Sequence, residues 1–239
     1  MVPPEQSSTK LCLKRKKVRR SRCKKPKDVT VYYCNINGLK AKQLSLLQIV
    51  EQLDPKIVLL CETKLPSDQI IKKLLPGYEV NSKTTKCGQS GLAIAVRNQT
   101  FNSVFDVTST SHSDILVTRV GFSTCATRII LGYAPQETDT VEVREQFYTE
   151  LGIELTLCKM AGDLALLAGD LNAKIENANG KTLAKSPNGK LLAESIHHQN
   201  MKILNFDNRC TGKWTHVIRT IGASSVTDYV AISIEMEKL

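Results

Sequence analysis

The sequence predicts an α/β fold in which helices pack on layered sheets, and three observations support this prediction. Residues 29–61 contain a strand, a helix and a second strand in turn. Residues 91–133 are β-rich, and residues 141–169 combine a long amphipathic helix with another buried strand. Strands that alternate with helices are typical of layered α/β domains. Hydrophobic residues make up 41% of the 239 residues, which is compatible with a single large core.

The first three elements follow from local composition and periodicity. Val29–Cys34 is β-branched and aromatic, which predicts a first strand. Gln43–Leu53 has its apolar residues at helical spacing, and Pro55 ends that helix. Ile57–Cys61 is a short apolar run, which predicts a buried strand.

The middle of the chain changes to short β-rich runs. Neighbouring antiparallel strands are predicted at Gly91–Val96, Val104–Val107, Ile115–Val120 and Thr127–Tyr133. A helix is then predicted over Val141–Met160, because its apolar residues are spaced for one buried face.

The C-terminal third begins with a strand predicted at Asp163–Gly169, whose almost continuous apolar content indicates that both its faces are covered. Lys174–Gly189 is polar and rich in Gly and Asn, so it is predicted to be a surface loop. The last predicted elements are a helix at Lys190–His198 and strands at Ile203–Phe206, Lys213–Thr215 and Ser225–Ser233.

The positive charge of the chain is concentrated at its N-terminus. Residues 1–28 contain eleven Lys and Arg residues but only Glu5 and Asp28 as acids, so this leader carries +9 of the formal +10. A segment this polar and self-repelling does not bury enough apolar surface to fold alone. We therefore expect a disordered basic leader followed by one domain over residues 29–239. The leader fits nuclear import, nonspecific phosphate contact or a simple solvated extension.

Cysteine spacing and hydropathy exclude several classes of protein. None of the eight cysteines forms a C-x-x-C pair, which argues against a zinc ribbon and favours a reducing compartment. No apolar run approaches the roughly 20 residues of a membrane helix. The N-terminus also has no apolar segment of the kind found in signal peptides. We expect an intracellular, nuclear location and no membrane partner.

Five short islands place polar side chains where predicted strands end. They read Cys34-Asn35-Ile36-Asn37-Gly38-Leu39, Leu60-Cys61-Glu62-Thr63-Lys64, Gly132-Tyr133-Ala134-Pro135, Ala168-Gly169-Asp170-Leu171-Asn172-Ala173 and Val226-Thr227-Asp228-Tyr229-Val230. Polar groups that converge at one rim of a sheet can form an oxygen-rich pocket for a hard cation and a phosphate. Phosphodiester hydrolysis needs such a cation, a group that orients water and donors for the phosphoryl oxygens.

Several island residues suit these tasks by position alone. Asn35 and Asn37 share one face of an extended segment, although Asn37 also fits a turn. Asp170 and Asn172 share a face in the same way. There Asp170 can orient the attacking water and Asn172 can donate to a phosphoryl oxygen, although a plain turn is the alternative. Glu62 follows a buried strand and is either a metal ligand or an exposed loop residue.

Taken in order, the islands resemble the endonuclease/exonuclease/phosphatase superfamily. They are most similar to the apurinic-type endonuclease domain of LINE-type (non-LTR) retrotransposons, over roughly residues 29–233. The resemblance implies a DNase I-like four-layer α/β sandwich. It also implies a DNA endonuclease that nicks its target and depends on magnesium, with manganese as an alternative ion.

The resemblance assigns roles to individual residues. The implied metal-binding residues are Glu62, Asn35 and Asn37. The implied catalytic residues are Tyr133, Asp170, Asn172 and Asp228. In this family Tyr133 would contact the scissile phosphate, Asp228 would pair with a catalytic histidine, and Thr215 would lie near the DNA strand. Trp214 is expected to be a core residue.

The chain departs from the family pattern at its C-terminal end. The family normally closes with a Ser-Asp-His run on a last strand, and no such run precedes Leu239. We therefore expect a C-terminally truncated domain that lacks its last strand and has impaired activity. The four histidines are His112, His197, His198 and His216. His216 is the nearest in sequence to Asp228, but its Lys-Trp-Thr-His setting fits a strand end.

Two other functions remain open. A catalytically inactive derivative of the same fold would bind nucleic acid or a protein. A phosphatase acting on inositol phosphates or sphingolipid is disfavoured, because such relatives carry extra histidines beside the Asp-x-Asn motif. The sequence Asn172-Ala173-Lys174 has none.

Overall fold

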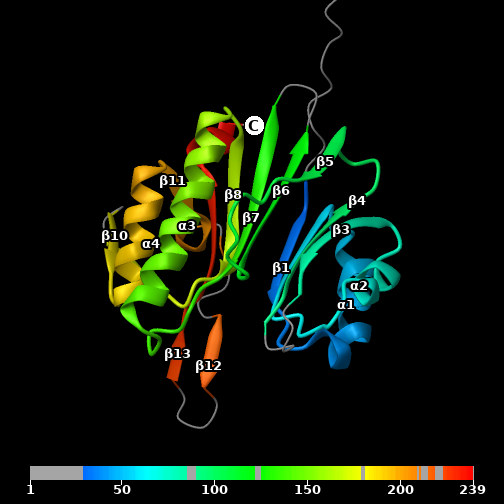
Figure 1. Ribbon diagram of the computed structural model, residues 1–239, viewed down its shortest axis with the longest axis horizontal. Helices are drawn as coiled ribbons and strands as arrows, with labels where there is room; N and C mark the ends of the chain where they lie inside the picture. The colour runs from blue at the N-terminus through cyan, green and yellow to red at the C-terminus, as the bar shows by residue number, and fades with distance from the viewer. Residues whose placement is uncertain are drawn as a thin grey trace, which may run out of the picture.

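The computed structural model describes residues 29–84, 90–121, 125–178, 181–208, 210, 215–218 and 223–238. The expected disordered leader and Trp214 lie outside these residues. Two sheets pack face to face, and helices cover both outer faces, so that the layers follow the order α/β/β/α (Figure 1). The predicted four-layer α/β sandwich is therefore confirmed.

The first sheet has the strand order β1-β2-β4-β3. Its strands are β1 (Val31–Asn35), β2 (Ile57–Cys61), β3 (Tyr78–Lys83) and β4 (Leu92–Arg97). Strands β1 and β2 are parallel, whereas β4 is antiparallel to β2 and to β3. Helices α1 (Leu39–Leu53) and α2 (Gln69–Leu74) cover the outer face of this sheet. Within the described residues β1 pairs with β2 alone, so it forms an edge of the sheet.

The second sheet has the strand order β11-β14-β8-β7-β6-β5. Its strands are β5 (Ser103–Asp106), β6 (Ile115–Gly121), β7 (Ala126–Tyr133), β8 (Leu164–Asp170), β11 (Met201–Ile203) and β14 (Asp228–Ser233). Strands β7 and β8 are parallel because the crossover helix α3 (Val141–Met160) joins them. Helices α3 and α4 (Pro187–His198) cover the outer face (Figure 1).

The remaining elements lie at the margins of the sandwich. They are the hairpin of β9 (Ile175–Ala178) and β10 (Lys181–Ala184), the hairpin of β12 (His216–Ile218) and β13 (Ala223–Ser225), and the 3-10 helices η1 (Leu204–Phe206) and η2 (Ile234–Lys238). Figure 1 shows the β12–β13 hairpin projecting beyond one end of the two sheets. Nowhere in the described part of the chain does a helix have the length and apolar content needed to span a membrane.

The core between the two sheets consists of inward-facing aliphatic side chains. Examples are Leu59 and Ile94 from the first sheet and Ile129 and Leu131 from the second, all fully buried. Their burial fixes the spacing of the sheets. The polar island residues can therefore meet only at the rim, where this apolar layer ends.

Several predicted elements differ from the observed ones, and three of these differences change the fold description. Lys174–Gly189 is not a loop, because it contains the β9–β10 hairpin and the first residues of α4. The predicted strand Ile203–Phe206 ends at Ile203 and continues as η1. Strand β4 does not neighbour β5, because it pairs with β2 and β3 in the other sheet. Local composition predicted the strand at Gly91–Val96, but the partners of a strand are decided by packing between distant segments.

Candidate active site

Polar side chains from both sheets meet at one rim of the sandwich. Asn35 is the last residue of β1, and Glu62 follows β2 directly. Tyr133 and Asp170 end the parallel strands β7 and β8, and Asp228 begins the adjacent antiparallel strand β14. The strand ends of both sheets thus bring together side chains that are far apart in the sequence.

The central contact of this rim is made by Asn35. Its side-chain Nδ2 donates to Glu62 Oε1 at 2.9 Å and to Asp170 Oδ2 at 3.0 Å. One amide group thus joins a carboxylate from each sheet and fixes their relative positions. The backbone N–H of Asn37 donates to Asn35 Oδ1 at 3.1 Å, which orients the amide itself.

The loops that carry these residues have an unusual backbone. The φ angles are 43° for Asn37, 52° for Glu62, 52° for Lys64 and 43° for Asn172, all in the left-handed region. Non-glycine residues in this region are strained by about 1–3 kcal/mol, and such residues cluster at functional sites. The Gly38 N–H also donates to the Glu62 carbonyl at 2.8 Å, which ties the first two loops together.

Lys64 adds a cation to this cluster. Its Nζ lies 2.9 Å from Glu62 Oε2 and donates to Asn37 Oδ1 at 2.6 Å. Burial disfavours ionisation of Glu62, but hydrogen bonds from Asn35 and Lys64 outweigh burial and lower the pKa of its carboxyl. Glu62 is therefore a carboxylate at neutral pH, as a metal ligand must be.

Tyr133 and Asn172 lie beside the carboxylates. Burial, together with the charge of Glu62 and a hydrogen bond to it, raises the pKa of the Tyr133 hydroxyl. This hydroxyl therefore stays protonated and acts as a donor. Asn172 Nδ2 donates to the Ala134 carbonyl at 2.7 Å, and its backbone N–H donates to Asp170 Oδ1 at 3.2 Å.

Asp170 is a basic carboxylate at this rim. Burial raises its pKa above the ordinary value, and the charge of its register partner Asp228 raises it further. Hydrogen bonds from Asn172 and Asn35 act in the opposite direction but are weaker. A carboxylate with a raised pKa is a better proton acceptor, which suits a group that orients or deprotonates water.

The Asp228 carboxylate contacts a tyrosine. Tyr33 Oη donates to Asp228 Oδ1 at 2.5 Å, from the first sheet to the second. Burial, with the charge of Asp228 adding to it, raises the pKa of Tyr33 well above its ordinary value, so the hydroxyl stays protonated and can donate to Asp228. Within the described ranges no lysine or arginine forms an ion pair with Asp228.

The described histidine side chains lie elsewhere. The His112 ring packs against Phe147 of α3, with centroids 5.3 Å apart, and its Nδ1 accepts from the Asp114 N–H at 3.2 Å. His197 and His198 lie on α4 in the outer layer. The backbone of His216 belongs to β12, but its side chain lies outside the described part of the chain.

Thr215 is exposed and lies next to Asp228. Its Oγ1 accepts from the backbone N–H groups of Thr227 and Asp228 at 3.0 and 3.2 Å. The hydroxyl therefore holds the start of β14 and the base of the β12–β13 hairpin. The expected position of Thr215 beside a DNA strand stays a prediction.

The donor set fits a hard divalent cation. No three Asp, Glu, His or Cys side chains in the described ranges form a ready-made metal-binding group. However, magnesium takes one or two carboxylates and keeps several waters, so it does not need three protein carboxylates. Glu62 and Asp170, joined by Asn35, match this requirement, and the oxygens of Asn35 and Asn37 are further neutral donors.

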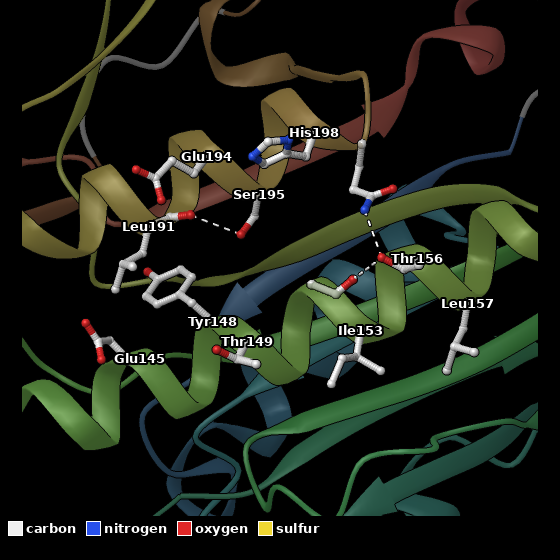
Figure 2. Close-up of a pocket in the computed structure, with 12 residues that line it drawn as sticks. Glu145, Tyr148, Thr149, Ile153, Thr156, Leu157, Leu191, Glu194, Ser195 and His198 are labelled. Carbon is white, nitrogen blue, oxygen red and sulfur yellow. Dashed lines mark hydrogen bonds between the residues drawn. The ribbon is translucent and has the colours of Figure 1, made fainter.

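A separate groove lies between α3 and α4 on the outer face of the second sheet (Figure 2). Tyr148 and Ile153 of α3 line it, together with Leu191, Glu194 and His198 of α4. None of the residues predicted for the site lines this groove. The candidate active site is thus the polar strand-end cluster and not this groove.

Three residues of the cluster were not predicted from the sequence. Lys64 stands in the second island but received no role, and Tyr33 was assigned only to a strand. Asn188 is fully buried and donates from Nδ2 to the Pro135 and Asn172 carbonyls at 2.9 and 3.0 Å. The alternation of Tyr33 and Asn35 on one face of β1 was the one signal available for Tyr33.

Comparison with solved structures shows the same fold in several nucleic-acid enzymes. A 3′ phosphatase from Neisseria, bound to a product DNA hairpin, matches with a TM-score of 0.70 at 16% identity, covering 88% of this chain and 89% of that one. The endonuclease domain of TRAS1, a telomere-specific non-LTR retrotransposon, matches with a TM-score of 0.66 at 17% identity, covering 89% and 88%. An AP endonuclease from Archaeoglobus fulgidus matches with a TM-score of 0.63 at 15% identity, covering 88% and 89%.

Sequence comparison gives the family. No curated protein matches the sequence significantly. The profile of the Endonuclease/Exonuclease/phosphatase family matches residues 33–229, which include every residue predicted for the site. This match, together with the four-layer fold and the polar rim, shows that the chain belongs to the endonuclease/exonuclease/phosphatase family.

Proposed function

We propose that this protein is a magnesium-dependent phosphodiester hydrolase that nicks DNA, of the type found in non-LTR retrotransposons. The observation that carries the proposal is the Asn35 amide, which joins Glu62 and Asp170 at hydrogen-bond distance. Two carboxylates held in this way suit one hard cation and one activated water. The fold shared with the TRAS1 endonuclease domain supports the retrotransposon type.

A divalent ion bound at Glu62 would neutralise charge that develops on the scissile phosphate. Asp170 orients the attacking water and accepts its proton, which its raised pKa favours. Asn35 keeps the two carboxylates at the distance that this division of tasks requires.

Donors for the phosphoryl oxygens come from the neighbouring loops. The protonated Tyr133 hydroxyl can turn from Glu62 to a phosphoryl oxygen when substrate enters. Asn172 has a second N–H on Nδ2 besides the one given to Ala134, and we assign that N–H to the phosphate. We assign Thr215, at the base of the projecting hairpin, to the contact with the DNA strand.

We expect slow nicking by the chain as given. The Asp228 carboxylate contacts the phenol of Tyr33, and no histidine ring in the described part of the chain contacts it. Loss of one donor to a phosphoryl transition state typically lowers the rate by about 10²–10³. The basic leader, with its net +9, is proposed to hold DNA by its phosphates and to direct the protein to the nucleus.

Nicking of supercoiled plasmid in magnesium and in EDTA tests the proposal. Glu62→Gln and Asp170→Asn are each expected to lower the magnesium-dependent rate at least a hundredfold, since they remove the metal ligand and the water-orienting group. Glu51→Gln, at an exposed position on α1, is the matched control and should leave the rate unchanged. Equal rates in EDTA and magnesium, or full activity of Glu62→Gln, would overturn it.

The alternative of a catalytically inactive binding domain has a separate test. Titration calorimetry with magnesium should show one site in the wild-type chain and no binding in Glu62→Gln. An inactive derivative would show no magnesium binding while still retaining DNA in a salt-dependent way.

A further inference from the structure

Strand β1 presents two hydrogen-bond donors to the second sheet. Tyr33 packs against the core between the sheets, whereas Tyr32 and Cys34 pack against the core under α1 and α2. Side chains two residues apart on a strand share a face. Tyr33 and Asn35 therefore point together from the first sheet toward the second.

Two carboxylates receive these donors. Asp228 of β14 and Asp170 of β8 are direct register partners on adjacent antiparallel strands. Tyr33 Oη donates to Asp228 Oδ1 at 2.5 Å, and Asn35 Nδ2 donates to Asp170 Oδ2 at 3.0 Å. Two donors on one strand thus match two acceptors on neighbouring strands of the facing sheet.

The remaining contacts of Asp228 hold its backbone more than its carboxylate. Its N–H donates to Thr215 Oγ1 at 3.2 Å, and its carbonyl accepts from Asn205 Nδ2 at 3.0 Å. Thr227 Oγ1 is 3.5 Å from Asp228 Oδ2, a long contact for a hydroxyl donor. Tyr33 therefore provides the one short side-chain hydrogen bond to this carboxylate among the described residues.

We infer that Tyr33 is a positioning residue for the reaction, which acts by holding the Asp228 carboxylate in place beside Asp170. This inference rests on the proposed function, because Asp170 is its water-orienting group. Without the Tyr33 hydroxyl, the Asp228 carboxylate lacks its short donor and no longer has a fixed position. Its negative charge, on the register partner of Asp170, then repels the Asp170 carboxylate from a changed position and displaces it from the geometry that Asn35 imposes.

The test compares Tyr33→Phe with Tyr32→Phe, which removes the same hydroxyl from the opposite face of the same strand. Plasmid nicking is measured over a range of DNA concentrations in magnesium, together with the thermal midpoint of each variant. Tyr33→Phe is expected to lower kcat about tenfold or more at a KM within about twofold, because hydrogen bonds to charged groups are strong. Tyr32→Phe is expected to change neither constant.

A double-mutant cycle with Asp228→Asn shows whether Tyr33 affects kcat through Asp228. If Tyr33 acts through Asp228, adding Tyr33→Phe to Asp228→Asn should lower kcat by less than about threefold. A full, multiplicative loss in the double variant would overturn the inference. So would an unchanged kcat in Tyr33→Phe, or a loss explained entirely by a smaller folded fraction.

The NMR signals of the aspartate carboxyl carbons test this inference independently of the proposed function. Aspartate labelled with ¹³C at its side-chain carboxyl should show shifted Asp228 and Asp170 resonances in Tyr33→Phe and unshifted ones in Tyr32→Phe. If the wild-type chain does not nick DNA, the proposed function fails, and these signals still decide whether Tyr33 holds the two carboxylates. Unshifted signals in Tyr33→Phe would overturn the inference whatever the activity.

Discussion

The Lys64 ammonium lies 2.9 Å from Glu62 Oε2, on the carboxylate that we assign to the metal ion. The Lys64 side chain is 35% exposed and that of Glu62 is 15% exposed, so the pair is only partly shielded from water. A lysine in this place holds Glu62 ionised, but it also competes with a divalent cation for the same oxygens. The position of Lys64 therefore bears directly on metal affinity.

Replacing Lys64 with methionine is expected to tighten magnesium binding. A partly exposed ion pair contributes about 1 kcal/mol or less, so the dissociation constant should fall by about fivefold at most. Titration calorimetry measures this change. The control is Lys72→Met, which breaks the Lys72–Asp68 ion pair on α2 and should leave affinity unchanged. Weaker binding by Lys64→Met would show that Lys64 orders the site and does not compete with the ion.

Asn188 connects α4 to two of the site loops, and Asn188→Ala is expected to disturb both. Its Nδ2 donates to the Pro135 and Asn172 carbonyls, and the side chain is fully buried. Removing it leaves these carbonyls without that donor, which costs about 1–3 kcal/mol in the free energy of unfolding. Urea unfolding should show this loss, and the nicking rate should fall as Asn172 shifts.

The control for this change is Asn177→Ala, on the exposed side of β9. It should alter the free energy of unfolding by less than about 0.5 kcal/mol, as exposed substitutions usually do. If Asn188→Ala proved equally mild, the loops after β7 and β8 would have to be held by other contacts.

Asp163 gives the second sheet a pH-dependent contact far from the site. It accepts from Arg119 Nε at 2.8 Å and Nη2 at 2.9 Å, and from Arg128 Nε at 3.1 Å. The hydrogen bond from Arg119 is the largest cause that lowers the pKa of Asp163 below its ordinary 3.8, and Arg128 adds to it. A carboxyl with a lowered folded-state pKa adds stability that is complete above its unfolded pKa. That stability is lost as the pH falls through the folded pKa.

Asp163→Asn should therefore destabilise the fold at neutral pH by about 1–3 kcal/mol, because it leaves two arginines without their carboxylate. The difference from wild type should persist down to pH 4 and shrink below it. Urea unfolding at pH 7, pH 5 and pH 3 measures this. A difference that stayed constant down to pH 3 would mean that the ion pairs contribute little to stability.

The basic leader should contribute to DNA binding through charge alone. Residues 1–28 carry a net +9, and each phosphate contact releases counterions, so affinity falls steeply with salt. Deleting the leader should lower the affinity at low salt and flatten the dependence of log Kd on log salt. Fluorescence anisotropy with a labelled duplex measures both. An unchanged slope after deletion would show that the leader does not touch DNA.

Segments with strong local patterns could be predicted from the sequence. Ile57–Cys61 and Val141–Met160 have the predicted bounds, because a short continuous apolar run and a long amphipathic helix each leave a clear local pattern. The β9–β10 hairpin was missed because its strands are polar. Its one strong signal was the Asn-Gly pair at residues 179–180, a frequent hairpin turn.

The positions of the candidate site residues at strand ends could be predicted from the sequence, but their contacts could not. Asn35 and Asp170 end their strands, and Glu62 directly follows one, as the islands indicate. That one amide bridges the two carboxylates depends on the packing of two sheets, which no local pattern specifies. The contacts of Lys64 and Tyr33 depend on the same packing.

Gly169 and Gly132 show how closely β7 and β8 approach just before the site, and a substitution there tests this geometry. The two glycines are register partners on the parallel strands. A Cβ at residue 169 would lie 2.0 Å from the Gly132 carbonyl oxygen, which belongs to the backbone and cannot move aside alone. Gly169→Ala must push the strands apart immediately before Tyr133 and Asp170.

We therefore expect Gly169→Ala to lower the free energy of unfolding by more than about 3 kcal/mol and to reduce nicking by the protein that remains folded. Gly152→Ala is the matched control, because a Cβ at that position in α3 meets nothing within 4 Å. It should stabilise the chain by about 0.5–1 kcal/mol, since alanine favours a helix over glycine. Urea unfolding of both variants measures these changes in the free energy of unfolding. If Gly169→Ala were as stable as wild type, the strands would not lie this close, and the positions of Tyr133 and Asp170 would need another cause.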